Sequence, residues 1–589
     1  YSAENAGLIK FDFLGLKTLT VINNTQKLIK KNDKDFNIEN ISFEDQKVFD
    51  LMSSGKTVGL FQIESAGMRE ALIQMKPNHI EDIIALVALY RPGPMSNISI
   101  YNDCKHGRKT PDYLHPLLEE ILKPTYGVII YQEQVMQIAQ KLSGFSAGEA
   151  DILRRAMGKK KRAELEKQKQ NFINGAVKNG ISKDIAAGIF LKIEPFAEYG
   201  FNKSHAAAYA IISYQTAFLK TYFPKEFIAA SMTMDISNQN KLGEFYEELK
   251  KINVEVIRPD INQCYHDFKT ENNKFYYALG GIKAVGLEAV SNIVKEREKN
   301  GKFLSLNDFI KRVNPKDINK LQLEGLVKAG AFDNIVNNRQ SLFNSIPKVI
   351  SKSKNYFENK NVNQIDLFTE DNENEASFIE NIKDWEFEER LSKEFEAVGF
   401  FISDHPLNQF KEIFKDYKIN DYQEFYLNDE FKDGNISATL LKIQERKTAK
   451  GNSYAVLKLS DLSSVFELFI FSEVLELNRN ILKEGNSLIL TLNKNLDENE
   501  NRFKRINIRK IAPLKDLFNK PISTVEFNVK NIKKINDILP FINNDGLTEI
   551  KIKIEDKDNN LNFKLKNKRK IDRKSLNILK NDDISLTIS

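Results

Sequence analysis

The chain has very few cysteines and no long apolar run. Only Cys104 and Cys264 occur among 589 residues, which excludes a disulfide framework and a thiolate zinc cluster and fits a reducing cytosol. No stretch of about 18 apolar residues is present, and the first residues lack the charged-then-apolar pattern of a secretion signal. We therefore expect a cytoplasmic protein with no membrane contact.

An excess of charge of one sign is also missing. Lys and Arg number 87 against 81 acidic residues, a net charge of +6, so any argument for nucleic-acid binding must rest on local clusters. At roughly 100–200 residues per domain, the length predicts about three to five domains. The chain starts with Tyr1 and a strand-like segment follows almost at once, so we expect a piece of a longer protein.

That segment, GLIKFDFLGL at residues 7–16, contains an unexpected acidic residue. With a period of two, Ile9, Phe11 and Phe13 share one face, which is typical of a strand buried on one side. Asp12 lies between the two phenylalanines in the sequence. A carboxylate that stays dry and unpaired there would destabilise the fold by several kcal/mol. We therefore expect Asp12 to have a partner.

The pattern is mainly helical from about residue 18 to 235, extended over 254–279, and helical again to about 333. Residues 352–379 are rich in Asn, Lys, Glu and Ser and poor in aliphatic residues, which predicts a mobile linker.

The texture changes at Gly434, after further helix around 384–416. Five strand-like segments follow, with a helix between the third and the fourth, an order that matches an oligonucleotide-binding barrel, the OB-fold. Other small β-barrels share this spacing. The tail from about 520 to 589 indicates a small βαββ-like unit rich in Lys and Asn.

The strongest basic cluster is RRAMGKKKR. Its cations are Arg154, Arg155, Lys159, Lys160, Lys161 and Arg162. A solvated face followed by a charge-paired helix explains it as well as a track for phosphate groups does.

The stretch EYGFNKSHAAAYA predicts a helix start with anion-binding character. Gly200 allows a tight turn, and Asn202 is a typical N-cap ahead of a long Ala-rich helix. Lys203 and His205 add donors beside the helix N-terminus. An ordinary capped helix is the alternative. Arg91, directly before a proline stop, is explained by capping a helix C-terminus.

Two further stretches predict binding. In GGIKAVGLEAV, Gly281, Lys283 and Gly286 form a short loop that enters a helix, as in a helix-hairpin-helix whose amides hold a DNA phosphate. A glycine-rich helix connection is the alternative. NQIDLF, residues 363–368, places a Leu-Phe pair in the polar linker, which indicates a docking peptide.

Taken together, these stretches resemble one family, the alpha subunit of bacterial DNA polymerase III, the replicative C-family polymerase. The resemblance covers nearly the whole chain. It rests on GLIKFDFLGLKTLT, GLFQIESAGMRE, ALVALYRPGP, KHGR, PTYGVIIYQEQVMQIAQ, ADILRRAMGKKK and YGFNKSHAAAYA, all in the family's order.

The resemblance implies a DNA-directed DNA polymerase, a nucleotidyltransferase in which three aspartates hold two Mg²⁺ ions. Asp12 matches the third aspartate, as a catalytic and metal-binding residue. The other two belong to an upstream strand that this sequence lacks, together with the family's phosphoesterase-like domain and thumb. We therefore expect these 589 residues alone not to polymerise DNA.

The implied fold is multidomain: mainly α-helical fingers and a helix-hairpin-helix region, then a five-stranded β-barrel of OB type and a small α/β C-terminal unit. The expected boundaries are 1–17 for the end of the palm, 18–270 for the fingers, 271–370 for the clamp-binding region, 371–430 for a linker and helical connection, 431–515 for the barrel and 516–589 for the tail.

Roles follow by the same resemblance. Nucleotide binding falls to Arg91, Asn202, Lys203 and His205. DNA binding falls to Arg154, Arg155, Lys159, Lys160, Lys161, Gly281, Lys283 and Gly286, and in the barrel to Arg446, Lys447, Lys450 and Tyr454. Docking on the sliding clamp falls to Gln364, Asp366, Leu367 and Phe368.

The implied partners are primer-template DNA, single-stranded template, a deoxynucleoside triphosphate and the beta sliding clamp. Binding of the clamp loader's tau subunit by the tail is left open, and a proofreading exonuclease would bind the missing N-terminal part. One rival hypothesis is a non-catalytic module that binds DNA and the clamp. Another, a helix-hairpin-helix glycosylase, lacks a convincing catalytic Asp or Lys after the hairpin.

Overall fold

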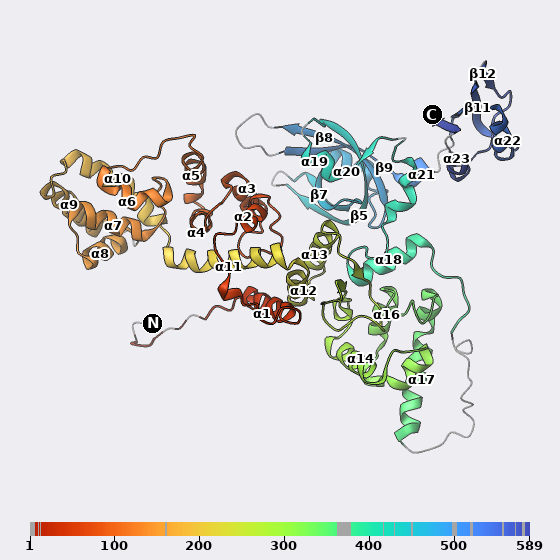
Figure 1. Cartoon of the computed structure of the whole chain (residues 1–589), viewed down its shortest axis with the longest axis horizontal. Coiled ribbons are helices and arrows are strands. Elements are labelled where there is room, and N and C mark those ends of the chain that lie inside the picture. Colours follow the sequence, from red (N-terminus) through yellow and green to blue (C-terminus); the bar gives the residue numbers. More distant parts are fainter. Residues whose placement is uncertain are drawn as a thin grey trace. The chain divides into compact units, whose positions relative to one another are not determined.

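The computed structural model describes residues 6–9, 11, 13–158, 162–361, 379–415, 417–428, 430–448, 451–496, 504–518, 522–556, 559–571, 573–579 and 583–588. The chain divides into two compact units, residues 1–382 and 383–589. Helices dominate the first unit and strands dominate the second (Figure 1).

The first unit begins with helices joined by short turns, as the sequence predicts. They are α1 (Lys17–Ile29), α2 (Gln46–Ser53), α3 (Ala66–Met75), α4 (Ile80–Leu89), α5 (Asn97–Lys105), α6 (Glu119–Leu122), α7 (Gln132–Ser143), α8 (Ala147–Gly158), α9 (Arg162–Lys178), α10 (Lys183–Tyr199), α11 (Lys203–Tyr222), α12 (Pro224–Met234) and α13 (Gln239–Lys251). Ser65 caps α3 by accepting from the Met68 amide. Gly144 ends α7 with φ 69°, a left-handed conformation that glycine adopts without strain.

Helices α6 to α10 share a hydrophobic core and gather together in Figure 1. The Ser143 hydroxyl donates to the Phe172 carbonyl at 2.8 Å and joins α7 to α9. A Cβ on Gly175 would lie 2.2 Å from the Ser143 carbonyl oxygen, so the two helices approach this closely only with glycine there. Within the described ranges, no helix is both long and apolar enough to cross a bilayer.

A buried ion pair anchors the C-terminal half of α11. Lys220 is 8% exposed and donates to Glu248 Oε2 of α13 at 2.8 Å. Its ammonium also donates to the carbonyls of Lys56 and Val58, both at 2.9 Å. Because an unpaired buried charge is strongly destabilising, these acceptors are what allow a lysine in this position.

A second buried carboxylate explains the lysine of the KHGR motif. Asp82 of α4 accepts from the Tyr101 hydroxyl at 2.9 Å and forms an ion pair with Lys105. Lys105 therefore joins α5 to α4 and has a structural role.

Short strands and more helices complete the first unit. They are β1 (Val256–Ile257), β2 (Lys269–Glu271), β3 (Lys274–Tyr276), α14 (Leu287–Asn300), α15 (Leu306–Arg312), α16 (Lys320–Lys328) and α17 (Arg339–Asn361). The extended segment predicted over 254–279 thus contains three very short strands. The linker predicted over 352–379 is wrong at its start, because α17 continues to Asn361. Its polar sequence suits an exposed helix as well as a loop.

The strand predicted at residues 7–16 does not form in the described part of that segment. Ile9, Phe11 and Phe13 are 79%, 72% and 94% exposed, and no described strand pairs with them. The alternation of apolar residues yields a strand only where another backbone satisfies its amides and carbonyls. Asp12 itself lies outside the described residues.

The second unit starts with α18 (Phe387–Val398), a 3-10 helix η8 (Pro406–Ile413), β4 (Ile419–Asn420) and α19 (Tyr422–Leu427). Five longer strands follow, with α20 (Ser472–Asn478) between the third and the fourth, as predicted. The strands are β5 (Asp433–Lys447), β6 (Ser453–Ser460), β7 (Val465–Phe471), β8 (Ser487–Leu496) and β9 (Lys504–Pro513).

These strands form an antiparallel sheet in the order β7-β6-β5-β8-β9, and β4 pairs with β5. Alternate residues such as Ile436, Leu457 and Leu490 enter its core. The predicted closed barrel is not confirmed, because the described residues of β7 and β9 show no pairing between the two outer strands.

The tail, linked through α21 (Leu514–Phe518), is a four-stranded sheet in the order β12-β11-β10-β13. Its elements are β10 (Thr524–Val529), α22 (Ile535–Ile538), β11 (Asp545–Asp556), β12 (Asn559–Lys564), α23 (Arg573–Leu579) and β13 (Ile584–Ile588). The structure thus adds α23 and β13 to the βαββ unit that the sequence predicts.

Candidate nucleotide-binding cluster

The beginnings of α7 and α11 lie side by side, although about 70 residues separate them in the chain. The Phe201 amide donates to the Ile130 carbonyl at 3.0 Å, and the Gln132 amide donates to the Phe201 carbonyl at 3.0 Å. Tyr131 and Phe201 form an isolated parallel bridge. The motifs YQEQ and YGFNKSH therefore meet at one place.

A carboxylate of the chain itself lies at the N-terminus of α11, and Asn202 caps the helix. The Lys203 amide lies 3.1 and 3.0 Å from the two carboxylate oxygens of Glu133. The Asn202 side-chain amide donates to the same carboxylate at 2.9 Å, and Asn202 Oδ1 accepts from the His205 amide at 2.8 Å. Glu133 thus uses the position that a phosphate would take.

Phe201 connects two of the predicted nucleotide-binding side chains. The Arg91 guanidinium lies over the Phe201 ring at 4.2 Å, a favourable cation–π geometry. The His205 ring meets the same Phe201 ring edge-on, and the two ring centroids lie 5.1 Å apart. Partial burial lowers the pKa of Arg91 from its ordinary value, and the guanidinium remains charged at any physiological pH.

Arg91, Phe201 and His205 thus form one cluster with Asn202 and Lys203. The Lys203 ammonium lies 5.4 Å from the centre of the Tyr131 ring. The structure therefore brings together all four residues predicted for nucleotide binding. Sequence reasoning missed Phe201 and Glu133, because their roles arise from contacts with residues about 70 positions away or more.

Aromatic contacts continue from this cluster to a cavity. His205 stacks on Tyr209 with ring centroids 4.4 Å apart, and Tyr209 lies 5.1 Å from Phe61. Phe61 lines a cavity of about 440 Å³. The lysines of this cavity, Lys17 and Lys241, are paired with carboxylates, so its lining does not favour a further anion.

The predicted basic surface begins next to the cluster. Arg154 forms an ion pair with Asp151 at 2.7 Å and lies 3.4 Å from Gln132 Oε1. Arg155 pairs with the same carboxylate at 2.8 Å. The hydrogen bond from Arg154 lowers the pKa of Asp151. Both arginines are therefore partly neutralised within the helix.

The predicted hairpin loop leads into α14. Lys283 and Gly286 are exposed, whereas Gly281 is buried and its carbonyl accepts from Gln239 Nε2 at 3.0 Å. Gly286 is the N-cap residue of α14, and no side chain caps this helix. The loop thus places Lys283 and an uncapped helix start at the surface, while Gly281 supports the loop from below.

The outer face of the β5–β7 sheet carries aromatic residues beside the predicted DNA-binding cations. Arg446 is paired in register with Tyr454, which is paired with Phe471. Phe469 and Phe471 are 51% and 47% exposed. These two phenylalanines were missed, although the alternation in VFELFIF places them outward.

Several predicted site residues lie outside the described part of the chain, so their predictions stay untested. They are Asp12, Lys159, Lys160, Lys161, Gln364, Asp366, Leu367, Phe368 and Lys450. Within the described part, no group of three or more His, Cys, Asp or Glu is arranged to hold a metal ion.

Comparison with known proteins decides the family. Residues 18–180 match the finger domain of the bacterial DNA polymerase III alpha subunit, and residues 253–342 match a helix-hairpin-helix motif. The chain is 42% identical over 502 residues to DNA polymerase III subunit alpha of Caulobacter vibrioides. The chain belongs to the family of bacterial DNA polymerase III alpha subunits.

The chain is similar to other alpha subunits to much the same degree. The subunit of Borreliella burgdorferi is 41% identical over 546 residues and that of Rickettsia conorii 38% over 597 residues. These alignments with the Caulobacter, Borreliella and Rickettsia subunits cover 85%, 91% and 94% of this chain but 44%, 47% and 50% of the relatives. The chain thus spans about half the length of the alpha subunits it matches.

Proposed function

We propose that the chain acts in template-directed DNA synthesis in chromosomal replication, as part of the DNA polymerase III holoenzyme. The observation that carries this proposal is the cluster of Arg91, Asn202, Lys203 and His205 around Phe201. The cluster joins Arg91 and the start of α7, which lie within the region that matches the finger domain, to α11. In this role it would hold the triphosphate of an incoming deoxynucleotide.

The chemistry of the cluster suits a polyphosphate. A guanidinium fixed over an aromatic ring presents its donors in a defined plane, which suits phosphate oxygens. Lys203 adds an ammonium group beside the Tyr131 ring, and His205 adds a ring nitrogen. Cations held in place before the reaction stabilise the negative charge that builds up during phosphoryl transfer.

Magnesium would supply activation of the primer 3′-hydroxyl and neutralisation of the triphosphate. We propose Asp12 as one ligand. The described residues contain no group of three or more His, Cys, Asp or Glu arranged to hold a metal ion. We expect a polypeptide of these 589 residues not to extend a primer with Mg²⁺ and four nucleotides. Template-dependent synthesis by this polypeptide would contradict that expectation.

The decisive test of the nucleotide site is triphosphate affinity. Arg91→Ala should weaken binding of a fluorescent deoxynucleoside triphosphate about tenfold, because a charge-assisted contact is worth roughly 1.5–3 kcal/mol. Arg108→Ala is the matched control. Arg108 is exposed, forms an ion pair with Asp103 at 2.8 Å and is not part of the cluster. Equal affinity for the Arg91 variant and the control would reject the site.

DNA binding is proposed at two further places. Lys283 and the uncapped start of α14 suit a backbone phosphate of the duplex. Tyr454, Phe469 and Phe471, beside Arg446 and Lys447, suit the stacked bases and backbone of a single-stranded template, in the manner of an OB-fold.

We also propose that QIDLF docks on the beta sliding clamp, with Leu367 and Phe368 in an apolar pocket. Such a tether raises the effective concentration of DNA between catalytic cycles. Ala at both positions should abolish clamp binding and leave DNA affinity intact. Survival of clamp binding would show that another segment docks.

The rival proposal is a non-catalytic module that binds DNA and the clamp. The uncapped start of α14 favours it, because a phosphate-binding helix end serves DNA binding without catalysis. Such a module would show salt-dependent DNA affinity that is indifferent to added triphosphate. Tighter DNA binding with the complementary triphosphate would favour the polymerase instead.

A further inference from the structure

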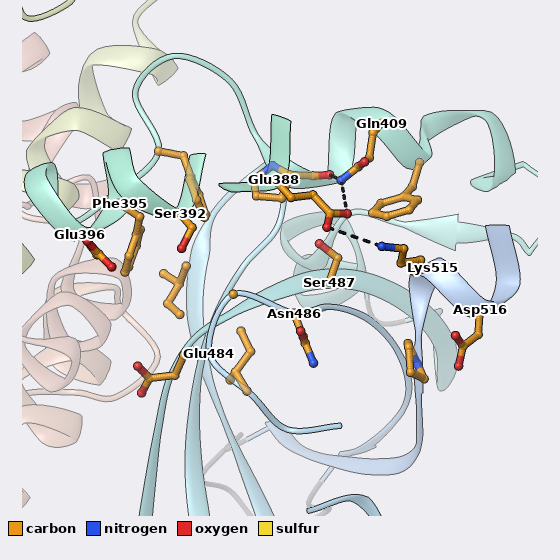
Figure 2. Close-up of a pocket in the computed structure, with 17 residues that line it drawn as sticks. Glu388, Ser392, Phe395, Glu396, Gln409, Glu484, Asn486, Ser487, Lys515 and Asp516 are labelled. Carbon is orange, nitrogen blue, oxygen red and sulfur yellow. Dashed lines mark hydrogen bonds and ion pairs between the residues drawn. The ribbon is translucent and has the colours of Figure 1, made fainter. Parts of the chain in front are cut away.

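The second unit contains an acidic cavity and, elsewhere, a basic edge. The cavity has a volume of about 490 Å³ and is lined by α18, η8, α21 and the turn before β8 (Figure 2). Its lining carries four carboxylates, and its one ammonium group, that of Lys515, lies 3.8 Å from Glu388. Like charges repel, so a nucleic acid is expected to avoid this cavity.

The basic edge is the sequence KLKNKRK, residues 564–570, in the tail. It contains five cations and no acidic residue. It starts at the last residue of β12, which is an outer strand of the four-stranded sheet (Figure 1). Leu565 packs against the hydrophobic core of the tail, whereas every second residue is an exposed lysine. These exposed lysines are Lys564, Lys566, Lys568 and Lys570.

The start of β11 fixes the main chain of the basic edge. The Leu565 amide donates to the Ile550 carbonyl at 3.0 Å. The Lys570 amide donates to the Asn544 carbonyl at 2.8 Å. A Cβ on Gly546 would lie 2.3 Å from the Lys570 nitrogen, so this close approach requires glycine. The lysines therefore project from a backbone that is already in place, which reduces the entropy lost on binding.

Two of the five cations are neutralised within the tail. Lys564 forms an ion pair with Glu549 at 2.7 Å. Arg569 forms one with Asp545 at 2.9 Å. The other three cations of the basic edge have no acidic partner among the described residues. Three such ammonium groups within five residues attract phosphate groups, because each neutralised phosphate releases counterions.

An exposed aromatic ring lies next to these charges. Phe563 of β12 is 51% exposed and directly precedes the basic edge. The side chains of Asn562 and Asn567 are exposed as well. Single-stranded nucleic acids are bound by this combination, in which cations follow the backbone and aromatic rings stack on the bases. An acidic peptide could satisfy the charges but has no base to stack on the ring.

We propose that residues 563–570 form a binding surface for single-stranded nucleic acid. The ammonium groups of Lys566, Lys568 and Lys570 bind backbone phosphates, and the ring of Phe563 stacks on a base. This surface belongs to the tail sheet, and it is separate from the outer face of the β5–β7 sheet and from α14. It does not depend on the proposed nucleotide site.

The test is a local fluorescence signal in the full chain. Asn567→Cys introduces an exposed thiol, whereas Cys104 and Cys264 are both buried, so a thiol-reactive dye labels the basic edge selectively. We expect a saturable change in dye fluorescence with oligo(dT) or oligo(rU) of about 16 nucleotides, and weaker binding of a duplex of the same length.

Three outcomes overturn the proposal. One is an unchanged dye signal with both oligonucleotides while their anisotropy shows that they bind the chain. Another is tighter binding of the duplex at the dye, which would contradict the assignment to single strands. The third is an equal response to polyglutamate, which would mean general attraction of polyanions.

Two matched double variants of the labelled chain locate the charges. Lys566→Ala with Lys568→Ala should weaken the affinity reported by the dye about tenfold. The slope of log affinity against log salt concentration should fall by about 1.4, since each phosphate contact of a single strand contributes about 0.7. Lys530→Ala with Lys533→Ala removes the same charge from exposed positions at the other end of the sheet and should change neither quantity. Equal losses in both doubles would overturn the proposal.

Two further results separate binding from other roles. Phe563→Leu keeps all charges and should weaken binding about threefold, because a stacked base is lost; unchanged affinity would count against the surface. Lysines on an outer strand can also prevent pairing with another chain. If the Lys566 and Lys568 double self-associates in size-exclusion chromatography but keeps its affinity, the lysines protect the edge and the proposal is overturned.

Discussion

The helices α11 and α14 begin with similar sequence patterns but leave their N-termini in different states. Each follows a glycine-containing loop with a lysine at its edge. At α11, Glu133 accepts from the Lys203 amide and Asn202 accepts from the His205 amide, so both first-turn donors already have partners. At α14, the N-cap residue is Gly286 and no side chain caps the helix. One helix start is occupied by side chains of the chain itself, and the other has no side-chain cap from its N-cap residue.

The two helices are otherwise anchored alike. A buried cation in the C-terminal half of each donates to main-chain carbonyls: Lys220 in α11 to Lys56 and Val58, and Arg297 in α14 to Ile261 and Cys264. The difference teaches that anion binding by a helix start depends on what the rest of the fold places there. The amides themselves are the same in both.

The largest expected effect comes from breaking the anchor of α11. Lys220→Met should lower the free energy of unfolding of the first unit by roughly 3 kcal/mol, because Glu248 would be left buried without its cation. Urea denaturation followed by limited proteolysis measures this change. Lys250→Met is the control, since Lys250 is exposed and pairs with Glu247 at 2.9 Å. An equally small loss in both variants would show that the buried pair contributes no more than a surface pair.

The same pair predicts a pH dependence. Burial acts to raise the pKa of Glu248, but Lys220 and Lys251 outweigh it and hold this pKa below its ordinary 4.5. A carboxyl group with a lowered folded-state pKa stabilises the protein above its unfolded pKa and loses that contribution as pH falls through the folded value. The destabilisation by Lys220→Met should therefore be greatest at neutral pH and shrink as pH falls below about 4.5. A constant difference down to that range would contradict the assignment.

The second largest effect is expected from adding a side-chain cap to the N-terminus of α14. Gly286→Asp should add an N-cap carboxylate to α14, because Gly286 has the extended φ of −76° that an N-cap needs. A Cβ there would lie 3.1 Å from Gln322 Nε2, a tight contact that requires the side-chain amide of Gln322 to shift slightly. Duplex DNA affinity should fall about tenfold. The slope of log affinity against log salt concentration should decrease by the amount expected for about one phosphate contact. Gly286→Ser, a neutral cap, is the control; if both lower DNA affinity equally, the charge is not what matters.

The smallest effect is expected from removing the Glu133 charge at the N-terminus of α11. Glu133→Gln keeps an oxygen for the Lys203 amide but removes a negative charge beside the proposed triphosphate. Affinity for the triphosphate should rise about threefold to fivefold, in line with roughly 1 kcal/mol for a charge at a helix end. Glu149→Gln is the control, since Glu149 accepts from the Ser146 amide at 2.8 Å in another first turn. Unchanged affinity in the Glu133 variant would mean that the triphosphate lies away from this amide.

The sequence predicts well what local periodicity decides. The helices up to about residue 235, the five strands from β5 to β9 and the helix between the third and the fourth all appear where the apolar pattern places them. The four residues that the family resemblance predicts to bind nucleotide lie together in one cluster.

The failures have a common physical cause, which is dependence on distant partners. The alternation at residues 7–16 predicts a strand, yet Phe13 is 94% exposed where no described strand lies beside it. Glu133 and Phe201 show no local feature of a site, because one acts on a helix start about 70 residues away and the other packs on Arg91. The closure of the sheet likewise depends on contacts between β7 and β9 that alternation within each strand does not encode.

The bridge between Tyr131 and Phe201 also affects when the cluster can form while the ribosome makes the chain. Arg91 leaves the ribosome long before its ring partner Phe201 exists, and at about 5–20 residues per second the interval is roughly 5–20 seconds. Helices α6 to α9 leave the ribosome within that interval, and α10, which completes their shared core, ends only two residues before Phe201. Arg91 therefore meets Phe201 only after the segment that carries these helices has been made, and forming the cluster requires closing a long loop, which is slower than forming local helical contacts.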